Sequence, residues 1–209
     1  MPVRKVITPS GRGFRGRYPS WLLNRMVATE SRLELHSIPL IEFSASVATY
    51  EEQPALIYYP DEQGMKSYYP DFLITHTDET VCWIEVKPSK KLLEPKNAAK
   101  YRAIAAHFQR LGQRFRILTE EEIYREPLHS NLRLLQRHLF HSAPAPEVIR
   151  QIIHCLRSGP RQATELGIPE HQLWCLIGRR ILFADLQSLP LGPETFLTVE
   201  GDRHAAHLY

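Results

Sequence analysis

Two carboxylates and one ammonium group in the centre of the chain could be brought together by a short hairpin. Asp71 opens the strand-like segment 72–76, and Glu85 and Lys87 lie two residues apart in the next strand-like segment. Side chains two apart on a strand point to the same face, so a hairpin would place Asp71 beside both. Because crowded carboxylates repel each other at a poorly solvated surface, we expect them to hold Mg²⁺, which takes hard oxygen ligands.

An ordinary surface hairpin with a solvated Glu85–Lys87 pair is the alternative, because motifs this short also occur by chance. The strand context and the apolar character of the run TVCWIEV favour the catalytic interpretation. A third carboxylate is expected from the preceding helix. Glu34 and Glu30, one turn apart on roughly the same face, are the two candidates. For either glutamate, a solvated helix position is the alternative.

The two segments resemble the PD-(D/E)xK nucleases, through YPDF at 69–72 and IEVKP at 84–88. The resemblance implies a Mg²⁺ centre of one or two ions, in which Mn²⁺ can substitute. It also implies that the peptide carbonyl of Val86 is a metal ligand. Lys87 would orient or deprotonate the attacking water and stabilise the charge of the transition state.

A longer set of motifs is similar to the TnsA family, the endonuclease subunits of heteromeric cut-and-paste bacterial transposases. The resemblance runs from residue 1 to about 140, through ESRLE at 30–34, VATYEEQPALIYY at 47–59, YYPDFLI at 68–74 and LLEPKNAAKYRAIAAHF at 92–108. It implies that Gln53 supports the site. It also implies four catalytic residues, of which the first three, with Val86, bind metal: Glu34, Asp71, Glu85 and Lys87.

The family resemblance also implies a division of labour on double-stranded DNA. This chain would nick the 5′ ends of a mobile element, while a DDE-type recombinase, TnsB, cuts and joins the 3′ ends and an AAA+ regulator, TnsC, controls both. A bacterial cytoplasmic protein, associated with the nucleoid during transposition and not with a membrane, is expected. The alternatives are a PD-(D/E)xK nuclease of restriction, repair or junction resolution, and a catalytically silent transpososome adaptor.

The elements that must position these residues follow from hydrophobic periodicity and turn residues. Helices are expected at 20–38, ended or kinked by Pro39, and at 95–111 and 128–140. Strands are expected at 47–51, 55–59, 72–76, 80–86 and 114–118. This order predicts an α/β, restriction-endonuclease-like mixed sheet flanked by helices.

The rest of the chain predicts a small winged-helix-like domain. Helices are expected at 147–157, 161–166 and 170–178, followed by a wing formed by ILFADL and TFLTVE. The predicted organisation is therefore a basic arm at 1–19, an endonuclease domain at 20–140, a linker at 141–146 and the winged-helix-like domain at 147–209.

The net charge of +3 is unevenly distributed, with +6 over residues 1–33, −6 over 34–99 and +4 over 100–140. Basic flanks suit a polyanion and an acidic centre suits a cation, although solvated faces are the alternative. No cysteine pair or histidine pattern indicates a disulfide framework or a zinc site, and no apolar run is long enough to span a membrane. Five arginines are candidate DNA contacts: Arg12, Arg15, Arg17, Arg179 and Arg180.

Overall fold

The computed structural model of the chain describes residues 14–200 and 208–209. The described residues form two compact units. The first contains residues 14–42, then Ser46–Ile123 and Tyr209, and the second contains Phe43–Ala45, residues 124–200 and Leu208.

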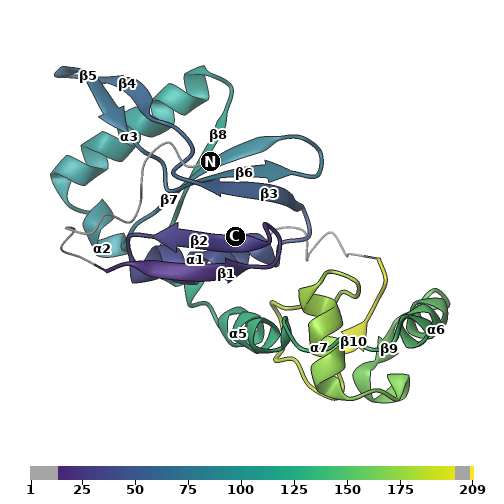
Figure 1. Cartoon of the computed structure of the whole chain (residues 1–209). Helices are drawn as coiled ribbons and strands as arrows, with labels where there is room; N and C mark the ends of the chain where they lie inside the picture. Colours follow the sequence, from purple (N-terminus) through teal and green to yellow (C-terminus); the bar gives the residue numbers. More distant parts are fainter. Residues whose placement is uncertain (1–13, 201–207) are drawn as a thin grey trace. The chain divides into compact units, whose positions relative to one another are not determined.

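A four-stranded mixed sheet organises the first unit, in the order β3-β6-β7-β8 (Figure 1). The strands are β3 (Val47–Glu52), β6 (Phe72–His76), β7 (Val81–Val86) and β8 (Arg114–Leu118). Neighbours are antiparallel except β7 and β8, which are parallel. A parallel pair needs a crossover connection, supplied here by α2 (Ser89–Leu92) and α3 (Pro95–Arg110). The prediction of a mixed α/β fold with a mixed sheet is confirmed.

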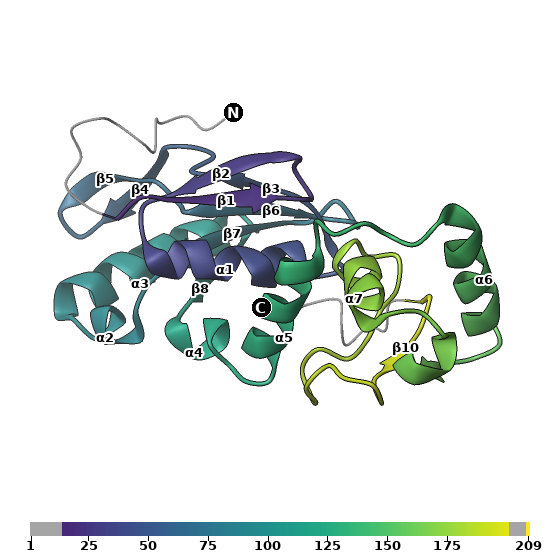
Figure 2. The same ribbon diagram turned by 60° about the horizontal axis from the view of Figure 1, so that its bottom comes forward.

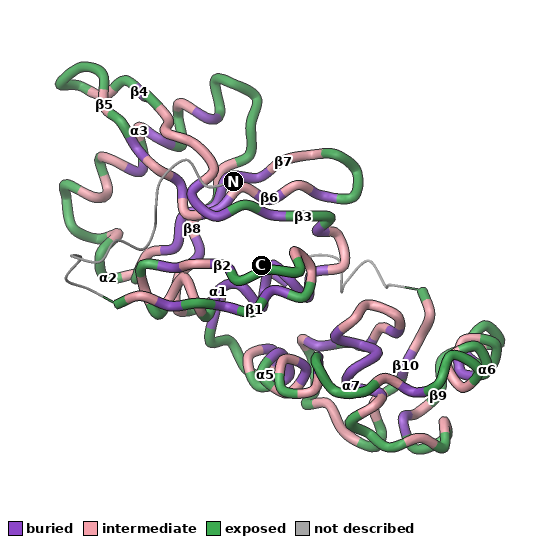
Figure 3. The backbone as a smooth tube through the Cα atoms, viewed as in Figure 1, coloured by how far each residue is buried: buried purple, intermediate pink, exposed green. Residues whose placement is uncertain are grey.

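The two faces of this sheet follow from the alternation of side chains along β6. Leu73 faces α3 and packs with Trp83, Ile104 and Phe108 in one apolar cluster. Phe72 and Ile74 face the other way and are buried, and burial is most continuous along β7 (Figure 3). Helix α3 also lies against the hairpin of β4 (Ile57–Asp61) and β5 (Gly64–Tyr68).

The N-terminal helix expected to start at residue 20 begins only at Arg32, so that part of the prediction is wrong. Residues before it form a hairpin of β1 (Gly16–Ser20) and β2 (Arg25–Thr29) beside α1 (Arg32–Glu42), as Figures 1 and 2 show. Ser20 Oγ accepts from the Leu23 amide at 3.0 Å, as an N-cap would, but it closes the turn of this hairpin. Asn24 completes the turn at φ 49°, a conformation that asparagine tolerates.

Helix α1 runs through Pro39 to Glu42, so of the two outcomes predicted for Pro39, an end or a kink, the end is wrong. A proline inside a helix removes one backbone hydrogen bond. Residues 37–42 are all buried, and that burial offsets the loss. The helix ahead of the proline is capped by Ser31, whose Oγ accepts from the Glu34 amide at 3.1 Å.

The described part of the second unit contains three α-helices, one short 3-10 helix and very little sheet. Its elements are α5 (Leu128–His138), α6 (Pro146–Leu156), β9 (Arg161–Gln162), the 3-10 helix η1 (Ala163–Leu166), α7 (Glu170–Gly178) and β10 (Phe196–Leu197). Strands β9 and β10 pair with each other. The segment predicted as the first wing strand makes a single bridge, from Phe183 to Thr198, and residues 161–162 are extended where a helix was expected. The winged-helix prediction is not confirmed.

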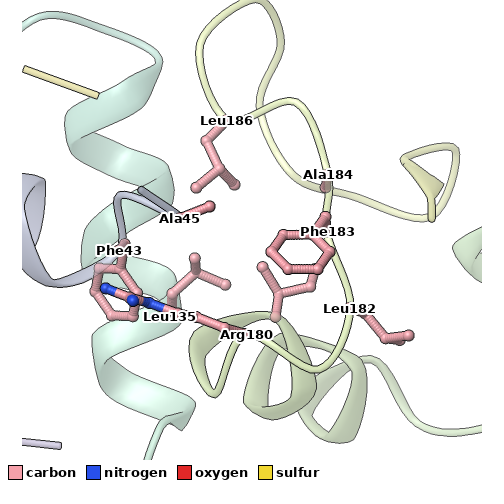
Figure 4. A pocket seen from close by; sticks show the side chains of 9 residues that line it. Phe43, Ala45, Leu135, Arg180, Leu182, Phe183, Ala184 and Leu186 are labelled. Atoms are coloured by element: carbon pink, nitrogen blue, oxygen red, sulfur yellow. The ribbon is translucent and has the colours of Figure 1, made fainter. Parts of the chain in front are cut away.

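Helix α5 packs against α7 and belongs to the second unit, although the sequence places it in the endonuclease domain. The functional division at the segment 141–146 therefore stays a prediction. Helix α5 precedes this segment in the chain but packs against α7, which follows the segment. A cavity of about 10 Å³ lies in this unit between Phe43, Leu135, Leu182 and their neighbours (Figure 4). It has room for about one water between largely apolar walls and is a packing gap, not a ligand site.

Helix α4 (Glu120–Ile123) ends the first unit and packs against α1 and β8. None of the helices within the described residues has the length and apolar character needed to cross a membrane.

Candidate active site

The β6–β7 hairpin brings Asp71 and Glu85 opposite each other. Phe72 pairs with Ile84 in the antiparallel register, so the preceding Asp71 and the following Glu85 form the next position. Asp71 Oδ2 accepts a hydrogen bond of 2.7 Å from the Val86 amide. The hairpin that the sequence predicts is therefore present, and its backbone holds one carboxylate beside the other.

Glu85 is a buried carboxylate, 3% exposed, that receives hydrogen bonds from two tyrosines. Tyr68 Oη donates to Oε2 at 2.6 Å, and Tyr101 Oη donates to Oε1 at 2.5 Å. Tyr68 comes from β5 and Tyr101 from α3, so the carboxylate is held from two elements beside its own strand. Burial and the Glu85 charge raise the pKa of both tyrosines, which keeps their hydroxyls protonated and donating.

Lys87 follows β7 directly, and its Nζ lies 3.1 Å from Glu85 Oε1. Its backbone amide donates to the Leu118 carbonyl at 2.9 Å, which extends the β7–β8 pairing by one residue. The side chain is one-third exposed, so its ammonium reaches both the buried carboxylate and solvent. Asp71, Glu85 and Lys87 therefore lie together as the sequence pattern predicts.

The electrostatics of Asp71 are those of a crowded carboxylate. Burial raises its pKa well above the ordinary value, and the negative charges of Glu85 and Glu34 raise it further. The Val86 amide and the Lys87 ammonium act in the opposite direction and are outweighed. An ion pair used only for stability would have the opposite balance, since a surplus of positive charge lowers a carboxyl pKa.

Glu34 reaches this group from the first turn of α1. Burial raises its pKa first, and the charges of Glu30 and Glu85 raise it further. Its Oε2 accepts from the Glu30 amide at 2.8 Å, so the side chain also satisfies a backbone donor just ahead of the helix. Glu30 is itself exposed. The structure thus gives Glu34, not Glu30, the partly buried position within electrostatic range of Asp71 and Glu85.

Gln53 supports Asp71 from the end of β3. The backbone amide of Gln53 donates to the Asp71 carbonyl at 2.9 Å, and the Gln53 backbone has φ 42°. The residue before it, Glu52, is buried and accepts two hydrogen bonds of 2.6 Å from the guanidinium of Arg25. This bidentate pair fixes the end of β3 against β2. The support role predicted for Gln53 is consistent with its backbone bond, and its buried Oε1 has no partner among the described residues.

The residues at this site fit a divalent cation in donor chemistry but do not form a complete cage. Within the described ranges, no three His, Cys, Asp or Glu side chains are close enough to hold an ion together. Asp71 and Glu85 offer hard oxygen donors whose mutual repulsion a cation would relieve. Further ligands would have to come from backbone oxygen, water or a movement of Glu34.

The central segment of the chain matches a known protein family. Residues 44–120 match the family described as TnsA-like endonuclease N terminal. This segment belongs to the TnsA-like endonuclease family. The TnsA-like match runs from just before β3 to the start of α4 and contains Gln53, Asp71, Glu85 and Lys87, whereas Glu34 lies outside it. No curated protein matches the chain. The family indicates a nuclease related to transposition.

Three residues near the TnsA-like site are absent from the sequence prediction. Tyr68 and Tyr101 hold Glu85, and Lys100 lies over both of their rings. Tyr101 is recognisable in the sequence only as an apolar-face residue of α3. Its hydroxyl role depends on which strand the helix covers, and no periodicity signals that.

The arginines predicted to contact DNA lie in different environments. Arg12 lies outside the described residues, Arg15 is half-buried, and Arg17 is exposed on β1. Arg179 donates to the Leu139 and His141 carbonyls at 3.2 and 2.8 Å, so it closes the end of α5 within the second unit. Arg180 follows α7 at φ 58° and lines the small cavity of that unit. Their contact with DNA stays a prediction.

Proposed function

We propose that this chain is a Mg²⁺-dependent DNA endonuclease that nicks the 5′ ends of a mobile element during cut-and-paste transposition. It would act with a DDE-type recombinase of the TnsB kind and an AAA+ regulator of the TnsC kind. The observation that carries the proposal is the convergence of Asp71, Glu85 and Lys87 at one end of the β6–β7 hairpin, inside a TnsA-like endonuclease segment.

Each side chain of the site has a role that its surroundings support. Asp71 and Glu85 would hold the metal with the Val86 carbonyl, and Glu34 would complete the set from α1. The ion would supply a Lewis acid for the phosphodiester and its attacking water. Lys87 carries an ammonium beside Glu85 that can orient this water and offset charge developing on phosphate. Tyr68 and Tyr101 hold the Glu85 carboxylate in a fixed orientation.

The experiment is strand-specific cleavage of a transposon-end duplex labelled on either strand, with Mg²⁺ and with or without the recombinase. Asp71→Ala should abolish nicking of the 5′ end, while recombinase cutting at the 3′ end survives. Glu51→Ala is the matched control, because it removes an exposed charge from β3 of the same sheet. Wild-type nicking by Asp71→Ala, or no nicking by the wild-type protein with its partners present, would contradict the proposal.

A further inference from the structure

A second lysine lies at the carboxylate site, and the sequence pattern of the site does not include it. The Nζ of Lys100, on α3, is 5.1 Å from the ring centroid of Tyr68 and 5.1 Å from that of Tyr101. Both distances are within the range of a cation–π interaction. These are the two rings whose hydroxyls donate to Glu85, so the ammonium is fixed by the same pair that fixes the carboxylate.

The position of Lys100 leaves its charge without an anionic partner at contact distance. No hydrogen bond or ion pair joins its Nζ to an acceptor among the described residues, whereas Lys87 pairs with Glu85 at 3.1 Å. Lys100 is also partly buried, and burial lowers its pKa. The more distant charges of Glu85 and Asp71 raise this pKa and that of Lys87 lowers it, and the effect of burial prevails. Burying an ammonium group without a paired anion costs folding free energy. An anionic ligand bound at this position would offset that cost.

The geometry points to Lys100 as a substrate-binding residue that contacts a phosphate of the DNA strand at the Asp71–Glu85 site. This inference rests on the proposed function and adds a specific contact to it. Lys87 and Lys100 lie on different elements, the end of β7 and the middle of α3, and the ring of Tyr101 is near both ammonium groups, at 5.9 and 5.1 Å. A phosphodiester entering between them would be bound from two directions, with Lys87 paired to the carboxylate and Lys100 available to the phosphate.

The alternative is that Lys100 only covers the two tyrosine rings, as long lysine side chains often do. The two roles differ in salt dependence. Removing one lysine that binds a phosphate of B-DNA reduces the slope of log K against log salt by about 0.9, whereas removing a lysine that only packs leaves the slope unchanged.

The experiment measures binding of the full chain to a fluorescein-labelled linear duplex, with Ca²⁺ replacing Mg²⁺, over a series of salt concentrations. Lys100→Met should weaken binding about tenfold, in line with loss of one charge-assisted hydrogen bond, and reduce the slope by about 1. Lys100→Arg should retain the wild-type slope. Lys96→Met is the matched control, since it removes an exposed charge one turn earlier on α3.

A wild-type slope in Lys100→Met would overturn the inference, and so would an equal loss in Lys96→Met, which would indicate only a general electrostatic field. Thermal unfolding of each variant establishes that the fold is intact, and Lys100→Leu replaces Lys100→Met if the latter unfolds. The two proposals fail separately. If the wild type nicks DNA but Lys100→Met binds DNA with the wild-type salt dependence, only this inference is wrong. If DNA binding depends on Lys100 but the wild type does not nick, only the nuclease assignment is wrong.

Discussion

The two units of this protein differ in how many carboxylates they bury among the described residues. The buried glutamates of the described chain, Glu42, Glu52 and Glu85, all lie in the first unit. The second unit buries Asn131, a neutral amide that donates to the Leu186 and Leu189 carbonyls and accepts from the Leu191 amide, at 2.8–2.9 Å. A neutral amide with three partners stabilises a fold at little electrostatic cost.

The carboxylates at the candidate site are held differently. Asp71 accepts one backbone hydrogen bond but is surrounded by further negative charge, and its pKa is raised as a result. Such a cluster costs folding free energy in the absence of a cation or substrate, and such sites are typical of function. The comparison teaches that substitutions at the carboxylate site should change activity more than stability, and that substitution of Asn131 should do the reverse.

After the loss of nicking expected for Asp71→Ala, the largest effect is expected at Lys87. Lys87→Ala should lower the nicking rate about 100- to 1,000-fold, the loss typical of removing one group that stabilises transition-state charge. Lys90→Ala, in the exposed helix α2, is the control and should retain wild-type activity. Single-turnover cleavage measures both. A Lys87→Ala rate near that of the wild type, with loss in Lys90→Ala, would transfer the role to Lys90.

A comparison of two neighbouring glutamates tests the third carboxylate. Glu34→Gln should lower nicking about 100-fold or more, because even the loss of a residue that only orients a metal ligand costs about 10- to 100-fold. The new amide oxygen can still accept from the Glu30 backbone. Glu30→Gln should have little effect because Glu30 is exposed. Metal titration of both variants by calorimetry separates weaker metal binding from slower chemistry. If Glu30→Gln is inactive and Glu34→Gln is active, Glu30 and not Glu34 is the third carboxylate.

In the second unit, Asn131→Ala should lower stability without a direct effect on the chemistry. It removes three hydrogen bonds from a buried side chain and leaves two carbonyls without that donor, which we expect to cost about 2–4 kcal/mol. Urea unfolding measures the loss, with Ser130→Ala, at an exposed neighbouring position, as the control. A large loss of nicking below the unfolding transition would show that the two units are not functionally separable in this way.

A smaller effect is expected at Arg25, which supports the site from a distance. Arg25→Ala breaks the bidentate pair with Glu52 and should cost about 1–3 kcal/mol of unfolding free energy. Arg25→Lys should recover only part of it, since lysine cannot make two parallel hydrogen bonds. Equal stability of Arg25→Ala and wild type would mean that the pair is mostly screened by solvent.

The smallest effect is a pH dependence of stability without metal. The folded state raises the pKa of Asp71, so it binds more protons than the unfolded chain once the pH exceeds the ordinary aspartate value. Stability contributed by this group is therefore lost as the pH rises toward the folded-state pKa. Asp71→Asn should show a less negative slope of unfolding free energy against pH than the wild type. Parallel pH profiles for the two proteins would refute the crowding of this carboxylate.

The sequence by itself determined the central hairpin and the residues at its end. Strands 72–76 and 114–118 and the helix 170–178 were recognisable from local patterns, and Glu85 and Lys87 share a face because of the two-residue period of a strand. The hairpin is short and local, so its register follows from the turn at Asp78 and Glu79.

Tertiary structure decided what local patterns leave ambiguous. Residues 20–29 became part of a hairpin instead of a helix. Gly16, Tyr18 and Ser20 are buried and alternate with exposed residues along β1, and Glu42, 22 residues after Ser20, accepts a hydrogen bond from the Ser20 hydroxyl. Helix α5 belongs to the second unit because it packs against α7. Tyr68 and Tyr101 bind Glu85 from β5 and α3, and Lys100 lies over their rings. Long-range packing of this kind has no period in the sequence.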